Sequence, residues 1–82
     1  MRRPTPVRVS DHALERYWER IGPISRHALT HNIRARLMPY LKQGAKVVNR
    51  AVMVELQEGV VAVAYPSLEG GWEVSTVMEV GA

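Results

Sequence analysis

Residues 10–21 read SDHALERYWERI, and this stretch decides the first half of the fold. Ser10 occupies the position of a helix N-cap, and Asp11 follows it in the first turn, where a negative charge suits the helix dipole. The apolar residues recur at the spacing of one buried helical face; they are Leu14, Tyr17, Trp18 and Ile21. The pattern predicts a helix that runs to about Arg20 and ends before Gly22-Pro23.

A second helix is expected after Ser25, which is another candidate N-cap. Its apolar stripe continues at helical spacing through Leu29, Ile33, Leu37, Tyr40 and Leu41. Pro39 is expected to end or kink this helix, because proline lacks the N–H that bonds back one turn. Gly44 is a candidate left-handed cap at the end of the helix.

After Lys46 the apolar period changes from 3.6 to 2, which is typical of β-strands. Glu58-Gly59 predicts a tight hairpin turn between an alternating run and the valine-rich residues 60–65, and residues 67–71 predict a second turn. The last strand is expected to present one apolar face made of Trp72, Val74, Thr76, Met78 and Val80. Residues 7–9 and 46–49 could add two short strands.

These elements predict an α+β fold: a short N-terminal strand, two helices, then a three- to four-stranded antiparallel β-meander packed on the helices. Residues 1–6 hold two prolines and two arginines and are expected to form a flexible basic arm. Residues 7–82 are then a single domain.

The charge is divided along the chain. All 11 basic residues lie in residues 1–50, where only Asp11, Glu15 and Glu19 oppose them, a net charge of +8. Residues 51–82 hold five glutamates and no Lys or Arg, a net charge of −5. Such asymmetry favours RNA or another polyanion as the partner of the basic part. The acidic part could contact a protein partner or a second copy of the chain in a homodimer.

The composition excludes several classes of protein. The absence of cysteine excludes disulfides, thiolate metal sites and thiol catalysis. The longest wholly apolar run, residues 60–65, is far too short to span a membrane. We therefore expect a cytoplasmic protein that does not associate with membranes.

The first helix carries a group of residues that could do chemistry. At 100° per residue, the side chains of His12, Glu15, Arg16, Glu19 and Arg20 are predicted to share the face turned away from the apolar stripe. Metal-independent RNA cleavage needs a base, an acid and a cation at the phosphate. His12 could transfer the proton, with Glu15 or His31 as second group, and Arg16 and Arg20 could bind the phosphate. A solvated helix face with internal ion pairs is the alternative.

The second helix carries a basic stripe opposite its apolar one. The candidate nucleic-acid ligands in and after this helix are Arg26, His27, His31, Arg34, Arg36, Lys42 and Lys46. His27 and His31 have a spacing that can bind zinc, but no glutamate follows His27 and no cysteine completes a site. We therefore predict no metal and no cofactor. A polar helix face in water is the alternative interpretation.

The opening residues S-x-H-A-x-x-R-x-x-x-R, at positions 10–20, resemble those of certain small phage and bacterial proteins of unknown function. These proteins are similar to the barnase–EndoU–colicin–RelE group of ribonucleases and toxins, in which a helical pair precedes an antiparallel sheet. The resemblance covers about a dozen residues and marks His12, Arg16 and Arg20. Ribonucleases of this group often take another active residue from the late strands, where this chain offers Ser75 and Thr76 but no His, Arg or Lys.

Two hypotheses follow from the sequence. The first is a small RelE/barnase-like protein that binds RNA through its basic half and could cleave it as a toxin-like endoribonuclease. The alternative is a non-catalytic, phage-type binding module that engages a host protein or a nucleic acid.

Overall fold

The computed structural model describes residues 6–42, 47–48 and 50–80. The elements in chain order are β1 (Val7–Val9), α1 (Asp11–Arg20), α2 (Arg26–Lys42), β2 (Val47–Val48), β3 (Ala51–Gln57), β4 (Val60–Pro66) and β5 (Trp72–Glu79). The predicted α+β order of a short strand, two helices and a strand meander is confirmed. Most of the expected N-terminal arm, together with Gly44 and Lys46, lies outside the described residues.

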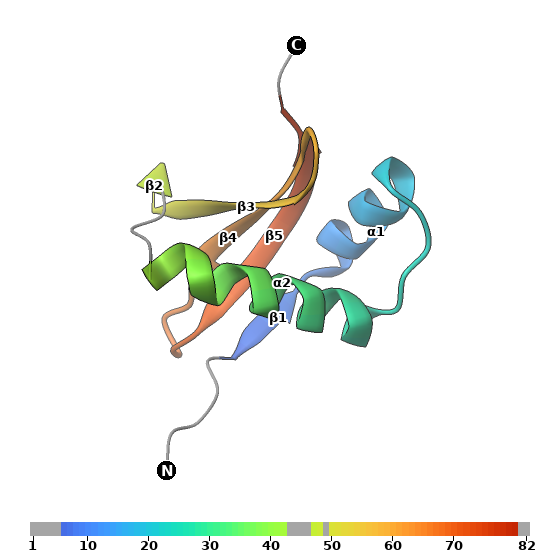
Figure 1. Cartoon of the computed structure of the whole chain (residues 1–82). Coiled ribbons are helices and arrows are strands. Elements are labelled where there is room, and N and C mark those ends of the chain that lie inside the picture. The colour runs from blue at the N-terminus through green and yellow to red at the C-terminus, as the bar shows by residue number, and fades with distance from the viewer. Residues whose placement is uncertain (1–5, 43–46, 49, 81–82) are drawn as a thin grey trace.

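The five strands form one mixed sheet in the order β1-β5-β4-β3-β2. Strands β2 to β5 are an antiparallel meander, as predicted, with the turn at Glu58-Gly59 between β3 and β4. β1 lies at the opposite edge from β2 and pairs parallel with β5, which the sequence did not predict. In Figure 1, α2 crosses in front of the sheet and α1 lies beside β5.

The core lies between the helices and one face of the sheet. Leu29, Ile33 and Leu37 of α2 are fully buried, so the predicted stripe of this helix is confirmed. They pack against sheet residues that also form this cluster, among them Val52, Val54, Ala62, Ala64, Val74 and Val77. Tyr40 and Leu41 pack at the margin of the cluster.

α1 is rotated relative to the predicted orientation. Ala13 is fully buried, and Tyr17 and Ile21, which follow it at intervals of four residues, pack on the core. Trp18 is 52% exposed, so its assignment to the buried face was wrong. Its indole N–H donates to the main-chain oxygen of Ile24 at 2.8 Å, which holds the ring at the connection between the two helices.

Pro39 does not end α2, which continues to Lys42. Both Pro39 and Ala35, whose carbonyl loses its partner at this proline, lie on the exposed side of the helix. Water can therefore bond the carbonyl that the missing N–H leaves free. Of the two effects expected of Pro39, an end of the helix is not found, for this reason.

A β-bulge changes the alternation of β5. Thr76 pairs with Val63 and Val74 pairs with Ala64, so Ser75 is the extra residue. Beyond the bulge Val77 faces the core, whereas Met78 lies on the opposite face and is 36% exposed. The predicted face was therefore wrong after Val74, because it assumed unbroken alternation.

The edge of β5 is shared between β1 and α1. β1 pairs with only the first three residues of β5, and Ser10 then ends the strand pairing. The Ser10 N–H donates to Val74 O at 3.1 Å, and its hydroxyl donates to Ser75 O at 3.0 Å. The same hydroxyl accepts from the Ala13 N–H at 3.0 Å, which confirms Ser10 as the N-cap of α1. One serine thus starts the helix and attaches it to the sheet.

We expect Ser10→Ala to lower the free energy of unfolding by about 2 kcal/mol, because it removes a helix cap and the partner of Ser75 O together. Ser25→Ala is the matched control. Ser25 caps α2 through the Ala28 N–H at 3.1 Å, and this cap bond is exposed. Its loss should lower the free energy of unfolding by about 1 kcal/mol. Urea unfolding measures both; equal losses would contradict a stabilising bond from Ser10 to β5.

Candidate functional site

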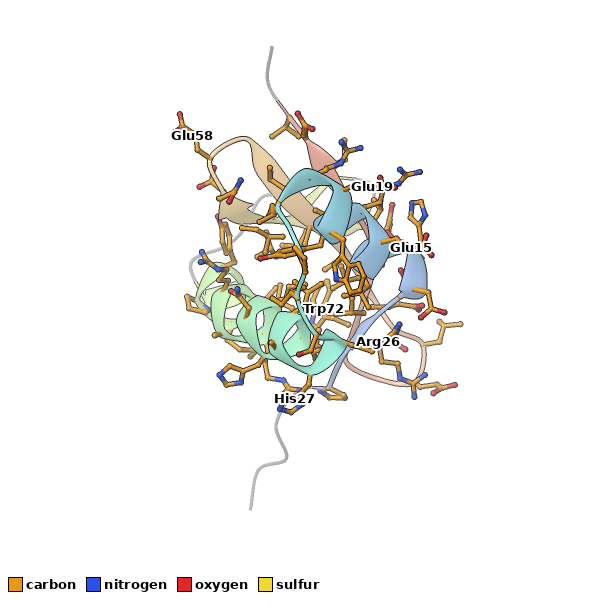
Figure 2. All side chains as sticks on the ribbon, turned by 90° about the vertical axis from the view of Figure 1, so that its right-hand side faces the viewer. Glu15, Glu19, Arg26, His27, Glu58 and Trp72 are labelled. Atoms are coloured by element: carbon orange, nitrogen blue, oxygen red, sulfur yellow. The ribbon has the colours of Figure 1, made fainter. Side chains whose placement is uncertain are left out.

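His12 and Glu15, the predicted proton-transfer residues, both lie on exposed positions of α1. Figure 2 shows Glu15 and Glu19 of α1 pointing outward from the ribbon. Within the part of the chain that the structure describes, neither His12 nor Glu15 makes a side-chain hydrogen bond or ion pair. The structure therefore gives His12 no orienting partner of the kind that a general acid or base needs.

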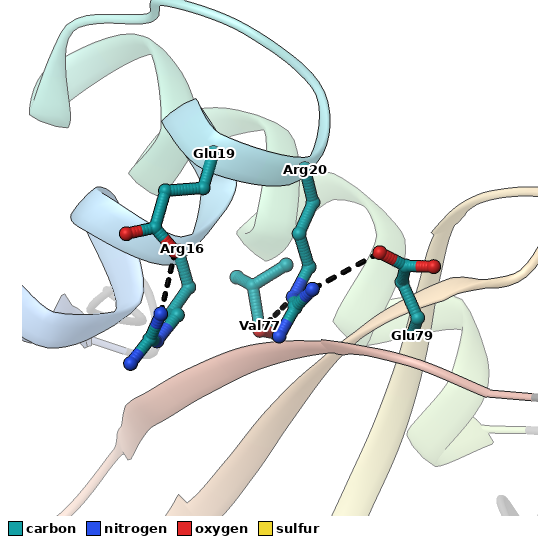
Figure 3. A network of polar contacts seen from close by, with 5 residues as sticks. All are labelled: Arg16, Glu19, Arg20, Val77 and Glu79. Atoms are coloured by element: carbon teal, nitrogen blue, oxygen red, sulfur yellow. Dashed lines mark hydrogen bonds and ion pairs between the residues drawn. The ribbon is translucent and has the colours of Figure 1, made fainter.

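Arg16, one of the two predicted phosphate ligands on α1, pairs with a carboxylate of its own helix. Its Nη1 lies 2.5 Å from Oε2 of Glu19, one turn further along (Figure 3). Both side chains are substantially exposed. This is the internal ion pair that the solvated-face alternative expected.

Arg20, the other predicted phosphate ligand, lies against the sheet. Its Nε donates to Val77 O at 3.2 Å, and its Nη1 lies 3.0 Å from Oε1 of Glu79 (Figure 3). The prediction that Arg20 shares the outward face was wrong, because the rotation of α1 turns this side of the helix toward β5. The bulge at Ser75 brings Glu79 to the same side. Arg20 therefore covers the β5 edge beyond the reach of β1.

The α1 residues that were predicted to act together therefore do not form one site. Arg16 and Arg20 each pair with a glutamate, and His12 and Glu15 make no hydrogen bond or ion pair with them. A phosphate at Arg16 or Arg20 would have to displace a glutamate that already pairs with the guanidinium. The helix itself carries Asp11, Glu15 and Glu19 against two arginines, a net charge of −1. α1 is consequently a poor surface for a polyanion.

α2 has the opposite character. Its 17 residues include no Asp or Glu, and they carry Arg26, Arg34, Arg36 and Lys42 together with two histidines. His27 and His31 are exposed on the side of α2 that faces away from its buried stripe. Figure 2 shows His27 pointing outward at the start of the helix.

The basic side chains of α2 differ in their contacts. Arg26 pairs with Asp11 of α1, so its charge is offset within the fold. The Nε of Arg36 donates to Asn32 Oδ1 at 2.7 Å, and its Nη1 lies 3.5 Å from the main-chain oxygen of Glu55.

Arg34 is half-buried, and its Nε lacks a hydrogen-bond partner among the described residues. The structure thus keeps His27, His31 and Arg34 on one face, as predicted. It sets Arg26 apart from them through the contact with Asp11. The side chain of Lys42 and all of Lys46 lie outside what the structure describes.

Pockets and metal clusters do not define a site in the described residues. A shallow hollow of about 90 Å³ lies at the turn between β4 and β5, beside Pro6, Arg8 and Trp72. It is much smaller than the roughly 300 Å³ at which small-molecule sites begin. Among residues 6–42, 47–48 and 50–80, no three His, Asp or Glu side chains are grouped to hold a metal ion. No described helix is long and apolar enough to cross a membrane.

Comparison of the chain with protein-family models, with curated proteins and with solved structures finds no match in any of the three. The structure by itself shows a small α+β protein with a basic helix on one side of a mixed sheet. The relationship to the ribonuclease and toxin group stays a prediction from residues 10–20.

We expect Arg20→Ala to lower the free energy of unfolding by about 1–2 kcal/mol, because Val77 O loses its donor and Glu79 its partner. Arg16→Ala is the matched control on the same helix. It removes an exposed pair within α1 and should cost about 0.5 kcal/mol or less. Thermal and urea unfolding of the two variants test this; a larger loss for Arg16→Ala would contradict the assigned role of Arg20.

Proposed function

We propose that this protein binds RNA through the outward face of α2, here called the α2 surface and defined by His27, His31 and Arg34. The observation that carries the proposal is the complete absence of acidic residues from this 17-residue helix. Contacts to phosphates dominate the affinity of nucleic-acid-binding proteins and need only basic or N–H donors.

The ion pairs of the fold support the α2 surface over α1. Four arginines are paired with carboxylates, in the pairs Arg8–Glu69, Arg16–Glu19, Arg20–Glu79 and Arg26–Asp11. Arg34 and Arg36 form no ion pair with a described carboxylate. Their charge is therefore available to an external anion. Arg34 belongs to the α2 surface, whereas Arg36 contacts the main chain of β3.

The spacing of the α2 surface suits an extended backbone of phosphates. His27, His31 and Arg34 are separated along the helix axis by about 6 Å and then about 4.5 Å. Such a stripe can contact successive phosphates of one strand without reading base edges. Binding should therefore be weakly dependent on base sequence and strongly dependent on salt. The preference for RNA over DNA rests on the resemblance at residues 10–20.

Cleavage has weaker support than binding. Arg16 and Arg20 are both paired with glutamates, so no guanidinium of α1 is free to stabilise a phosphorane beside His12. The proposed function is accordingly binding without hydrolysis.

Arg34→Gln should weaken binding of a short fluorescent single-stranded RNA about threefold or more at moderate salt. It should also reduce the slope of log affinity against log salt by about 0.7 for each phosphate that the variant no longer neutralises. Arg16→Gln is the matched control and should leave both quantities unchanged. Fluorescence anisotropy with RNA and DNA of the same sequence measures them. Equal effects of the two changes, or no binding of RNA at low salt, would refute the proposal.

Mixed RNA incubated with the protein and EDTA should stay intact from about pH 5 to about pH 8, for the wild type and for His12→Ala alike. Gel electrophoresis of the RNA measures this. Cleavage by the wild type that is abolished in His12→Ala would overturn the binding-only proposal and establish the endoribonuclease hypothesis instead.

A further inference from the structure

The face of the sheet opposite the helices is apolar at its centre. The register of β3, β4 and β5 places six uncharged side chains there: Met53, Val61, Val63, Tyr65, Thr76 and Met78. We call this the outer sheet face. None of the six belongs to the core cluster beneath the helices. Within the described residues, both helices pack on the other side of the sheet.

The outer sheet face is more apolar than a solvated sheet surface usually is. Val61 and Val63 are only 7% and 5% exposed, although no described helix lies over them. Met78 and Tyr65, which lie beside them, are 36% and 40% exposed and belong to the few large apolar side chains that reach solvent. The face therefore has a shielded valine centre with Met and Tyr side chains at its margin, and methionine adapts readily to different apolar partners.

Two acidic residues lie at opposite corners of this face. Glu55 pairs across the strands with Val61, and Glu73 pairs with Tyr65. Both glutamates are exposed, and neither forms an ion pair with a described basic residue. Arg8, which is next to Glu73 in the register, is itself paired with Glu69 at 3.6 Å. Arg36 of α2 lies 3.5 Å from the main-chain oxygen of Glu55 but forms no ion pair with its carboxylate. Both carboxylates are therefore free to pair with a cation of a partner.

The dimensions of the face fit one helix. The axes of β3 and β5, on either side of β4, are about 10 Å apart, and residues 61–65 of β4 extend over about 13 Å. An α-helix with its side chains is about 10 Å in diameter. The diagonal between Glu55 and Glu73 is about 16 Å, which corresponds to about 11 residues of helix.

We infer that the outer sheet face binds an amphipathic helix of a protein partner, with an apolar stripe on the sheet and Lys or Arg about 11 residues apart at the two glutamates. A second copy of the chain fits less well. The face measures on the order of 200–300 Å², compared with about 800 Å² on each partner in a stable interface. This inference is independent of the α2 surface, because the two lie on opposite sides of the sheet.

The probe is a synthetic helical peptide with one leucine stripe and lysines 11 residues apart. A scrambled peptide of identical composition, which lacks the stripe, is the control for charge alone. Titration of labelled peptide into the full chain should give saturable binding of the striped peptide and at least about tenfold weaker binding of the scrambled one. Equal binding of the two peptides would overturn the inference.

Substitutions on the face should then locate the peptide. Met78→Lys should weaken binding about tenfold or more, and Glu55→Lys and Glu73→Lys about fivefold each. Glu58→Lys makes the same charge change at the β3–β4 turn (Figure 2), beyond the end of the face, and should have a smaller effect than Glu55→Lys. Loss of binding in Glu58→Lys equal to that in Glu55→Lys would refute the site.

Sedimentation of the free chain provides a separate test of the occupant. We expect a monomer, for the wild type and for Met78→Lys alike. A wild-type dimer that dissociates in Met78→Lys would assign the face to a second copy and overturn the inference.

Discussion

The rest of this structure depends on how the edge of β5 is covered. β1 pairs with only the first residues of that strand, so the carbonyls further along would face solvent or another chain. Ser10 and Arg20, at the two ends of α1, donate to Ser75 O and Val77 O instead. Because α1 is attached at both ends, its rotation about its own axis is fixed. That rotation decides which of its side chains reach solvent and which do not.

The sequence predicted those features of the fold that depend only on residues close together in the chain. The cap at Ser10, the stripe Leu29-Ile33-Leu37 and the turn at Glu58-Gly59 each follow from residues close in sequence, and all are present. The rotation of α1 could not be predicted, because helical periodicity defines the width of an apolar stripe without saying which margin meets the sheet. Trp18 and Arg20 lie on the two margins, and their predicted positions were both wrong.

The contact of Arg20 with Glu79 also could not be predicted from local sequence patterns. The two residues are 59 positions apart, and they meet only because the bulge at Ser75 reverses the alternation of β5. Nothing in the residues around Ser75 signals that bulge. The α2 stripe of His27, His31 and Arg34 was predictable because it lies on one regular helix. The predicted group on α1 was not kept together, because Arg20 has a partner on β5. On α2, His27, His31 and Arg34 stay on one face, whereas Arg26 pairs with Asp11 of α1.

These contacts give the divided charge of the sequence a more specific meaning. Arg8 and Arg20, which lie near the sheet, are paired with glutamates, whereas α2 contains no acidic residue. The most direct test is an NMR titration of the ¹⁵N-labelled chain with single-stranded RNA. We expect amide shifts concentrated around His27, His31 and Arg34, with little change at His12. Shifts centred on His12 and Arg16, with α2 unaffected, would contradict it.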